Sequence, residues 1–177
     1  MVSVSAWGGT FGTSNAVADI EPLTKRIANF GWHTQIFMRG DQIAQMEDVL
    51  NRIPTPIVFD HLGGLGPEGT KHPAFTFMRR LIDAGRAWVK LSGAYITPTG
   101  FTTDYAPATA VAKAFVAAAP ERLVWGSDWP HPNADIRSKP DDAKLFDLLT
   151  DWAPNEGARH RILVENPESL YGFPHTS

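Results

Sequence analysis

Segments with helical spacing of apolar residues alternate along the chain with short, continuous apolar runs. Leu23, Ile27 and Phe30 share one helical face, which predicts a helix over residues 20–30 that ends at Gly31. By the same spacing, further helices are predicted at residues 41–53, 75–84, 106–119, 141–152 and 156–164. The apolar runs between them predict strands at residues 32–38, 56–59, 87–91 and 123–125.

This alternation predicts an α/β fold in which parallel strands are covered by helices. A continuous apolar strand needs cover on both faces, and a helix is the usual connection that brings the next strand in parallel. Glycine and proline, 15 and 14 residues respectively, are spread along the chain rather than gathered in one linker. We therefore expect a single domain over residues 1–177.

The composition excludes several classes of protein. Sixteen basic and nineteen acidic side chains give a formal charge of −3, which is too balanced for the cationic surface that nucleic acids require. No apolar run approaches the roughly 18 residues of a membrane span, so we expect neither nucleic acid nor membrane as a partner, and a cytoplasmic location. The chain has no cysteine, so any metal must be bound by His, Asp or Glu.

Polar residues directly after predicted strands are the candidates for catalysis, because ligands of such sheets bind beyond the carboxyl ends of the strands. His61 follows the strand at 56–59, and Asp128 follows the strand at 123–125. Both ends lie at the same edge of the predicted sheet, so we expect the two side chains to meet around one substrate as the catalytic pair. The alternative for each is structural: a buried histidine bonded to the backbone, or an aspartate that caps a turn.

The strand at 32–38 carries two candidate substrate-binding residues. Its alternation places Gln35 and Phe37 on one face, together with His33. His33 lies near the beginning of the strand, away from the catalytic end, so we interpret it as structural.

The loop after Asp128 and the strand at 87–91 carry further candidates. Trp129 and His131 are candidate substrate-binding residues, although His131 has the alternative of capping a turn. Lys90 and Ser92 either point into the site or pack between strands, and the sequence leaves both possibilities open.

Four stretches of the sequence resemble the amidohydrolase-related family of TIM-barrel hydrolases. They are Phe59–Gly64, Val89–Gly93, Leu123–Pro132 and Asn166–Phe173. The nearest branch is the lactone hydrolases, which include pyrone dicarboxylate and sugar lactonases. The resemblance implies a partial (β/α)8 barrel with N-terminal strands 1–2 missing, the C-terminal two-thirds of a barrel. It also implies that His61 ends the fifth strand and Asp128 the eighth.

The same resemblance implies a divalent metal, commonly zinc, bound by His61 and Asp128 beside a His-x-His pair on the first strand. The sequence contains no His-x-His. Catalytic zinc takes about three protein ligands, so a metal at His61 and Asp128 is conditional on a third ligand such as His33 or His131. Without a third ligand no cofactor is expected, and the pyrone lactonase branch is known to work without metal.

The expected function is that of a hydrolase which opens a lactone or related cyclic ester, a small-molecule substrate. Asp128 would act as the general base on water, and His61 would polarise the carbonyl oxygen or help to hold a metal. Gly64 and Phe37 stand where an arginine and a tyrosine of related lactonases are expected, which disfavours a dicarboxylate substrate.

Two alternative functions remain open. In the first, the chain is a catalytically inactive truncated barrel that acts as a binding or assembly module. An unpaired strand at the edge of such a barrel also favours a homo-oligomer. In the second, the chain is a decarboxylase on the same fold. The strand at 87–91 is not followed by the histidine that such relatives carry, which argues against this second alternative.

Overall fold

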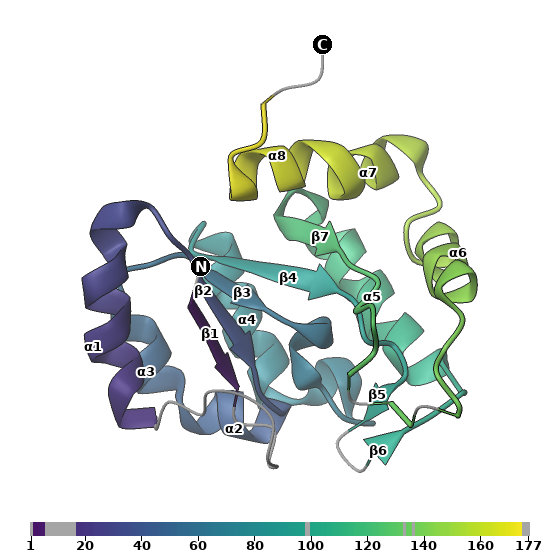
Figure 1. Cartoon of the computed structure of the whole chain (residues 1–177), viewed down its shortest axis with the longest axis horizontal. Helices are drawn as coiled ribbons and strands as arrows, with labels where there is room; N and C mark the ends of the chain where they lie inside the picture. The colour runs from purple at the N-terminus through teal and green to yellow at the C-terminus, as the bar shows by residue number, and fades with distance from the viewer. Residues whose placement is uncertain (1, 6–16, 98–99, 133, 136, 175–177) are drawn as a thin grey trace.

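A computed structural model of the chain describes residues 2–5, 17–97, 100–132, 134–135 and 137–174 (Figure 1). Five strands form one parallel sheet in the order β1-β2-β3-β4-β7. Their bounds are β1 Val2–Ser5, β2 Thr34–Phe37, β3 Ile57–Phe59, β4 Ala87–Leu91 and β7 Leu123–Trp125. A separate antiparallel pair consists of β5 Ile96–Thr97 and β6 Gly100–Phe101. The predicted α/β fold with parallel strands is therefore confirmed.

Helices connect the strands and cover the sheet, with α4 and α5 behind it in the view of Figure 1. The α-helices are α1 Val17–Ile27, α2 Gly40–Gln45, α3 Glu47–Arg52, α4 Pro73–Asp83, α5 Ala106–Ala118, α6 Asp142–Trp152, α7 Glu156–His160 and α8 Asn166–Tyr171. A membrane-spanning helix is not found in the described part of the chain.

The ends of the helices follow from local chemistry. After α1, a 3₁₀ turn over Ala28–Phe30 ends at Gly31, which adopts the left-handed conformation predicted for it (φ 67°). The side chain of Asp141 caps α6 by accepting a hydrogen bond from the backbone of Ala143. These residues set where the helices start and stop, and hence how each chain segment enters the sheet.

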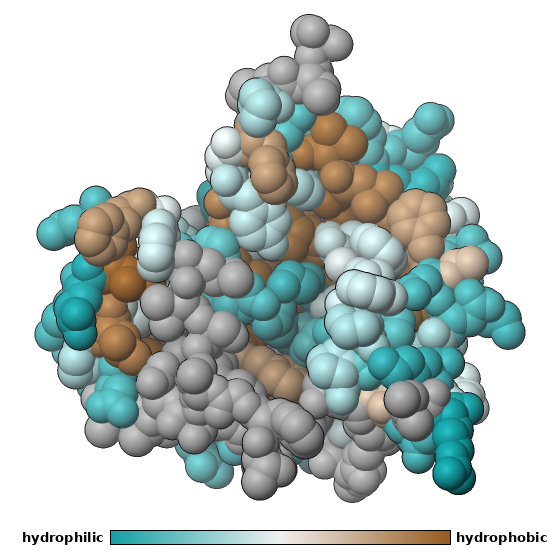
Figure 2. Space-filling view, in the orientation of Figure 1, coloured by the Kyte–Doolittle hydropathy of each residue, from teal (hydrophilic) through white to brown (hydrophobic). Residues whose placement is uncertain are grey.

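The strands β3 and β7 are apolar at every position because both of their faces are covered. On the face that packs against the helices, residues such as Phe59 and Val89 belong to the main hydrophobic core. On the other face, Val58, Trp88 and Val124 form a small second cluster, against which Leu170 of α8 packs. Figure 2 shows hydrophilic residues near the centre of the front face of the molecule, with hydrophobic residues above them towards α7 and α8.

Three details differ from the sequence prediction. The helix predicted at 41–53 is two helices, because the backbone breaks at Met46 (φ −98°, ψ 10°). The helix predicted at 156–164 continues through a π-helical turn into α8, where Pro167 is tolerated in the first turn. The pair β5 and β6 was not predicted, since strands of two residues leave no periodic pattern.

The strand numbering implied by the family resemblance is not matched at one point. Fifth and eighth positions for the strands before His61 and Asp128 require two strands between them. The described sheet has only β4 between β3 and β7. The two candidate catalytic residues are therefore one strand closer in the sheet than the resemblance implied.

Asn166 fastens α8 to the segment before β7. Its side-chain amide donates to the backbone carbonyls of Pro120 (2.8 Å) and Leu123 (2.6 Å), and the residue is buried. We expect Asn166→Ala to lower the free energy of unfolding by about 2–3 kcal/mol, because both carbonyls lose their donor. Urea unfolding followed by circular dichroism measures the change. The exposed Asn51→Ala on α3 is the control, expected to stay within about 0.5 kcal/mol of wild type; equal effects of the two substitutions would contradict this assignment.

Candidate active site

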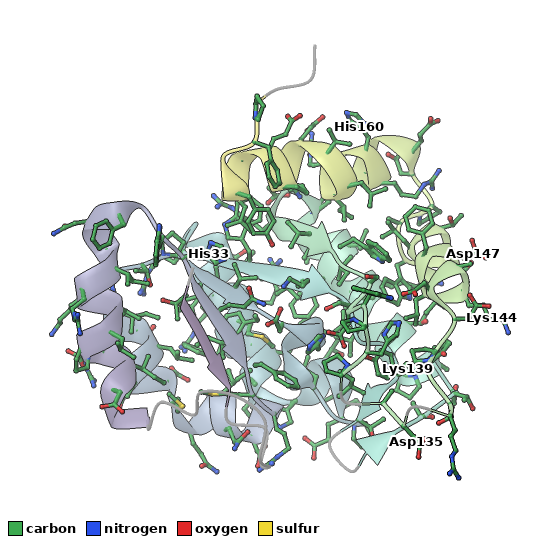
Figure 3. The ribbon with its side chains drawn as sticks, in the orientation of Figure 1. His33, Asp135, Lys139, Lys144, Asp147 and His160 are labelled. Atoms are coloured by element: carbon green, nitrogen blue, oxygen red, sulfur yellow. The ribbon has the colours of Figure 1, made fainter. Side chains whose placement is uncertain are left out.

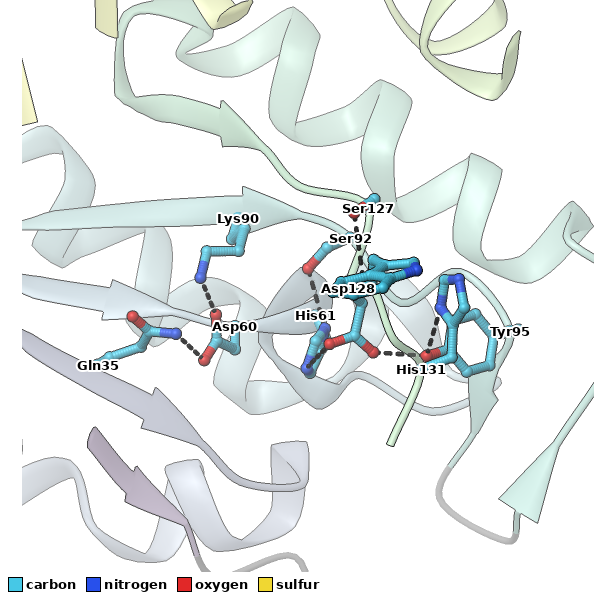
Figure 4. A network of polar contacts seen from close by, with 10 residues as sticks. Gln35, Asp60, His61, Lys90, Ser92, Tyr95, Ser127, Asp128 and His131 are labelled. Atoms are coloured by element: carbon cyan, nitrogen blue, oxygen red, sulfur yellow. Dashed lines mark hydrogen bonds and ion pairs between the residues drawn. The ribbon is translucent and has the colours of Figure 1, made fainter. Parts of the chain in front are cut away.

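Polar side chains from four neighbouring strands converge at the carboxyl edge of the sheet (Figure 4). They surround a cavity of about 290 Å³. The residues that line it are Gln35, Asp60, His61, Lys90, Ser92, Gly126, Ser127, Asp128 and Trp129. The edge of the sheet that the sequence indicated is thus the edge at which chemistry-bearing residues gather.

His61 and Asp128 face each other in this cavity. His61 Nε2 lies 3.8 Å from Asp128 Oδ1, and the two side chains are 10% and 16% exposed. His61 Nδ1 lies 2.9 Å from Ser92 Oγ, and the edge-to-face ring of Phe37 packs against the imidazole with 4.8 Å between ring centroids. The two residues proposed as the catalytic pair are therefore brought together, 67 positions apart in the sequence.

The backbone turns sharply at both residues. His61 (φ 49°) and Asp128 (φ 65°) adopt the left-handed region, which side chains other than glycine occupy at a cost. The backbone therefore turns within three residues of the ends of β3 and β7, and both side chains lie at the carboxyl edge of the sheet. Strain of this kind is typical of positions where the orientation of a side chain matters.

Gly93 leaves room for the His61 ring. A Cβ atom there would lie 2.6 Å from His61 Nδ1, and Gly93 has a φ of 61°. We expect Gly93→Ala to lower the free energy of unfolding by about 1–3 kcal/mol, from backbone strain and the clash together. Gly126→Ala is the matched control, because its Cβ would meet Lys90 at an ordinary 3.4 Å. Thermal denaturation of the two variants compares them, and a Gly93→Ala variant as stable as Gly126→Ala would show that this space is not needed.

Burial sets the charge state of His61. It lowers the pKa of the imidazole below its usual 6.5, and Lys90 acts in the same direction, whereas Asp60 and Asp128 oppose it. The ring is therefore neutral near pH 7. Since Nε2 faces a carboxylate, the tautomer with the proton on Nε2 is favoured, and Nδ1 accepts from the Ser92 hydroxyl.

Tyr95 holds the other oxygen of Asp128. Its hydroxyl donates to Asp128 Oδ2 at 2.5 Å, and it also lies 3.2 Å from His131 Nδ1. Burial, followed by the hydrogen bond to Asp128, raises the pKa of Tyr95, so the phenol keeps its proton. His131 Nε2 contacts Asp142 Oδ1 at 3.0 Å. His131 is buried behind Asp128 and does not line the cavity, unlike the position expected for a substrate-binding residue.

Gln35, Asp60 and Lys90 form a second polar group beside His61. Gln35 donates to Asp60 Oδ2 at 2.5 Å, and Lys90 Nζ lies 2.8 Å from Asp60 Oδ1. The Asp60 side chain is only 6% exposed, so the ammonium of Lys90 compensates a buried negative charge. Lys90 and Ser92, whose direction the sequence left open, both line the cavity.

The remaining candidates lie at the border of the site or outside it. Trp129 is 73% exposed and forms part of the cavity mouth. His33 is buried at the start of β2 (Figure 3), where its ring packs against Tyr171 with 5.6 Å between centroids. Its Nε2 has no hydrogen-bond partner among the described residues. His33 thus lies apart from the cavity, as its place in the strand predicted.

A metal does not fit the described donor set. His61 Nε2 and Asp128 Oδ1 are two donors, and in the described ranges no three or more His, Asp or Glu side chains are grouped to hold an ion. His131 has both ring nitrogens engaged, and Asp60 is paired with Lys90. Neither residue supplies the third ligand that catalytic zinc requires.

A second cavity of about 420 Å³ shares His61 with the first. Much of its lining is apolar, contributed by Leu62, Leu65, Ile96, Pro107, Ala108 and Val111. Such a lining suits an uncharged part of a ligand.

Sequence reasoning assigned no role to three residues of the site. Asp60 follows β3 immediately, and its position at a strand end was a usable signal. Tyr95 comes after Ser92 and Gly93, a pair that could have indicated a turn back towards the sheet. Asp142 begins α6, and nothing in its local pattern distinguishes it from a residue of an ordinary helix start.

Comparison with known proteins identifies the family. Residues 4–173 match the Amidohydrolase family. The chain belongs to this family. The resemblance to this family that the sequence indicated is therefore confirmed.

Relatives of this Amidohydrolase family member act on lactones, as their names state. The chain is 34% identical over 160 residues to D-galactarolactone isomerase of Agrobacterium fabrum, a match that covers 88% of this chain and 53% of the relative. It is 34% identical over 143 residues to 4-sulfomuconolactone hydrolase of Hydrogenophaga intermedia, covering 80% and 47%. The chain spans about half the length of these curated relatives.

An apo crystal structure from Agrobacterium tumefaciens has a similar fold, with a TM-score of 0.85 and 32% sequence identity. The match covers 98% of this chain and 61% of that protein. The five-stranded sheet is thus part of the barrel of the Amidohydrolase family, and the expected partial barrel is confirmed.

Proposed function

We propose that this chain is a lactone hydrolase in which Asp128 and His61 act on one carbonyl group. The observation that carries the proposal is their arrangement: an acceptor and a donor face one cavity with 3.8 Å between Oδ1 and Nε2. The names of the relatives support a lactone as the substrate. The two cavities that share His61 offer space for a ring and an uncharged substituent.

Asp128 is the general base. Its Oδ1 takes a proton from water while the water oxygen forms a bond to the lactone carbonyl carbon. Oδ2 is occupied by Tyr95, so Oδ1 is the oxygen that remains available on the cavity side. A positioned base of this kind contributes about 10²–10⁴-fold to the rate.

His61 stabilises the negative charge on the carbonyl oxygen. With Nδ1 accepting from Ser92, the Nε2 proton is directed into the cavity, where it donates to the oxyanion. The bond between the carbonyl carbon and the ring oxygen then breaks, and that oxygen takes the proton from Asp128. The product is an open-chain hydroxy acid, whose carboxyl group releases one proton to water near pH 7.

Lys90 limits the charge of the substrate. Its ammonium group lines the cavity, but Asp60 already compensates most of this positive charge. We infer that the site accepts a lactone with at most one acidic substituent. This agrees with the expectation, drawn from Gly64 and Phe37, that a dicarboxylate is disfavoured.

A lactone isomerase is the second candidate, favoured by the name of the relative in Agrobacterium fabrum. In that reaction a hydroxyl group of the substrate attacks the carbonyl in place of water. Asp128 and His61 would have the same tasks, and the product would be a second lactone.

The experiment is a screen of five- and six-membered lactones, neutral or with one carboxylate, in which proton release is titrated at constant pH. Hydrolysis releases one proton per ester opened, and we expect wild type to release protons at least about 10²-fold faster than Asp128→Asn. Folded wild-type protein that turns over none of these lactones would contradict the proposal and favour a binding or assembly module.

The lowered pKa of His61 predicts a pH-dependent contribution to stability. Because the folded-state pKa lies below the usual 6.5, the contribution of the neutral ring is complete above about pH 6.5 and is lost as the pH falls through the folded value. We expect the free energy of unfolding of wild type, relative to His61→Asn, to decrease below pH 6.5 by up to about 1.4 kcal/mol per pH unit. His33, also lowered by burial, is present in both proteins and cancels. Urea unfolding of both proteins from pH 8 to pH 5 measures this change. Wild type that becomes more stable relative to His61→Asn as the pH falls would contradict the prediction.

A further inference from the structure

We propose that His131 and Asp142 position the catalytic base through Tyr95. The inference rests on the proposed function and adds to it a chain of contacts behind the cavity. The first contact joins Asp128 to the Tyr95 hydroxyl, and the second joins this hydroxyl to His131 Nδ1 (Figure 4). The third joins His131 Nε2 to Asp142 Oδ1. None of these partners other than Asp128 touches the cavity.

This chain of hydrogen bonds runs from the catalytic site to the protein surface. The His131 side chain is 3% exposed and packs edge-to-face on Tyr95, with 5.4 Å between ring centroids. Asp142 is 49% exposed and is the first residue of α6, which Asp141 caps. The outer end is therefore held by a helix, and the inner end is held by buried rings.

The hydrogen atoms of the chain can be assigned from its donors and acceptors. Tyr95 has a single hydroxyl hydrogen and donates it to Asp128, so towards His131 it accepts. Asp142 presents a carboxylate oxygen, which also accepts. Both contacts of His131 are satisfied at once only when each ring nitrogen carries a proton. The ring then places a positive charge behind the phenol.

This arrangement fixes which oxygen of Asp128 reacts. Tyr95, held by the charged ring, keeps Oδ2 of Asp128 in place, and Oδ1 remains directed to His61 and the attacking water. When the chain is broken, the carboxylate gains rotational freedom in a loop whose backbone is already in the left-handed region. The base is then less often in its productive orientation, which lowers kcat and leaves substrate binding unchanged.

Asp142→Asn tests the chain at its exposed end, where folding is not at risk. It removes the charge that pairs with His131, whereas Asp141→Asn removes a neighbouring carboxylate and keeps the helix cap, since asparagine caps as well as aspartate. We expect Asp142→Asn to lower kcat about tenfold at unchanged KM, Asp142→Glu to restore much of it, and Asp141→Asn to match wild type. Equal kcat values for Asp142→Asn and Asp141→Asn would overturn the proposal.

A second measurement needs no substrate. In protein labelled with ¹⁵N-histidine, NMR reports which ring nitrogens of His131 carry protons. We expect both to be protonated in wild type and in Asp141→Asn, and one to be lost in Asp142→Asn. A singly protonated His131 in wild type would overturn the positioning chain even where lactone turnover is found. Loss of the proton in Asp142→Asn, without turnover of any lactone, would sustain the chain and refute only the proposed function.

Discussion

Replacement of Asp128 by asparagine is expected to lower kcat for lactone hydrolysis by about two to four orders of magnitude. The amide keeps the shape of the side chain and can still accept from Tyr95 through its oxygen, but it cannot take a proton from water. Steady-state rates of hydroxy acid formation, compared with wild type on the best lactone of the screen, measure the effect. KM is expected to change little, because the base acts in the transition state.

Asp151→Asn is the control for this substitution. It removes a carboxylate from an exposed position of α6, far along the helix from Asp142, and we expect wild-type turnover. Full turnover by Asp128→Asn would show that another group activates the water.

His61→Asn is expected to lower kcat by about 10²–10³-fold, the loss of one donor to a developing oxyanion. Asparagine tolerates the left-handed backbone at this position (φ 49°), so the turn after β3 is kept. Its shorter side chain does not reach the place of the imidazole Nε2, which removes the donor without introducing bulk. Turnover by this variant is measured under the conditions used for Asp128→Asn.

His160→Asn on the outer side of α7 is the matched control, since its side chain is 59% exposed (Figure 3). We also expect the double variant of His61 and Asp128 to be less impaired than the product of the single effects, because both residues act on the same carbonyl group. A double variant whose loss of kcat equals the product of the two single losses would indicate that the two residues act independently.

The strands could be predicted because burial on both faces leaves a clear trace in the sequence. Ile57–Phe59 and Leu123–Trp125 are apolar at every position, and in the structure one face joins the main core while the other is covered in part by Leu170. The pair β5 and β6 could not be predicted, because its pairing depends on the path of a loop rather than on a pattern of side chains.

Gln35 could be predicted from the alternation of its strand. The catalytic pair could be predicted because each residue lies within three positions of the end of a strand. Parallel pairing places both residues at one edge. Tyr95 reaches Asp128 after a turn of the backbone at Gly93, which has a positive φ. His131 lies behind Asp128 in a loop where Asp128 and His131 themselves have positive φ values. Such turns depend on single backbone torsions, which hydrophobic periodicity does not record.

Mass spectrometry of the product formed in ¹⁸O-labelled water tests the central claim most directly. If Asp128 and His61 direct water to the lactone carbonyl, wild type must place one ¹⁸O atom in the carboxyl group of the product. Asp128→Asn must form this labelled product at least about 10²-fold more slowly. A product that carries no ¹⁸O, or a label that enters at the same rate without Asp128, would contradict the account.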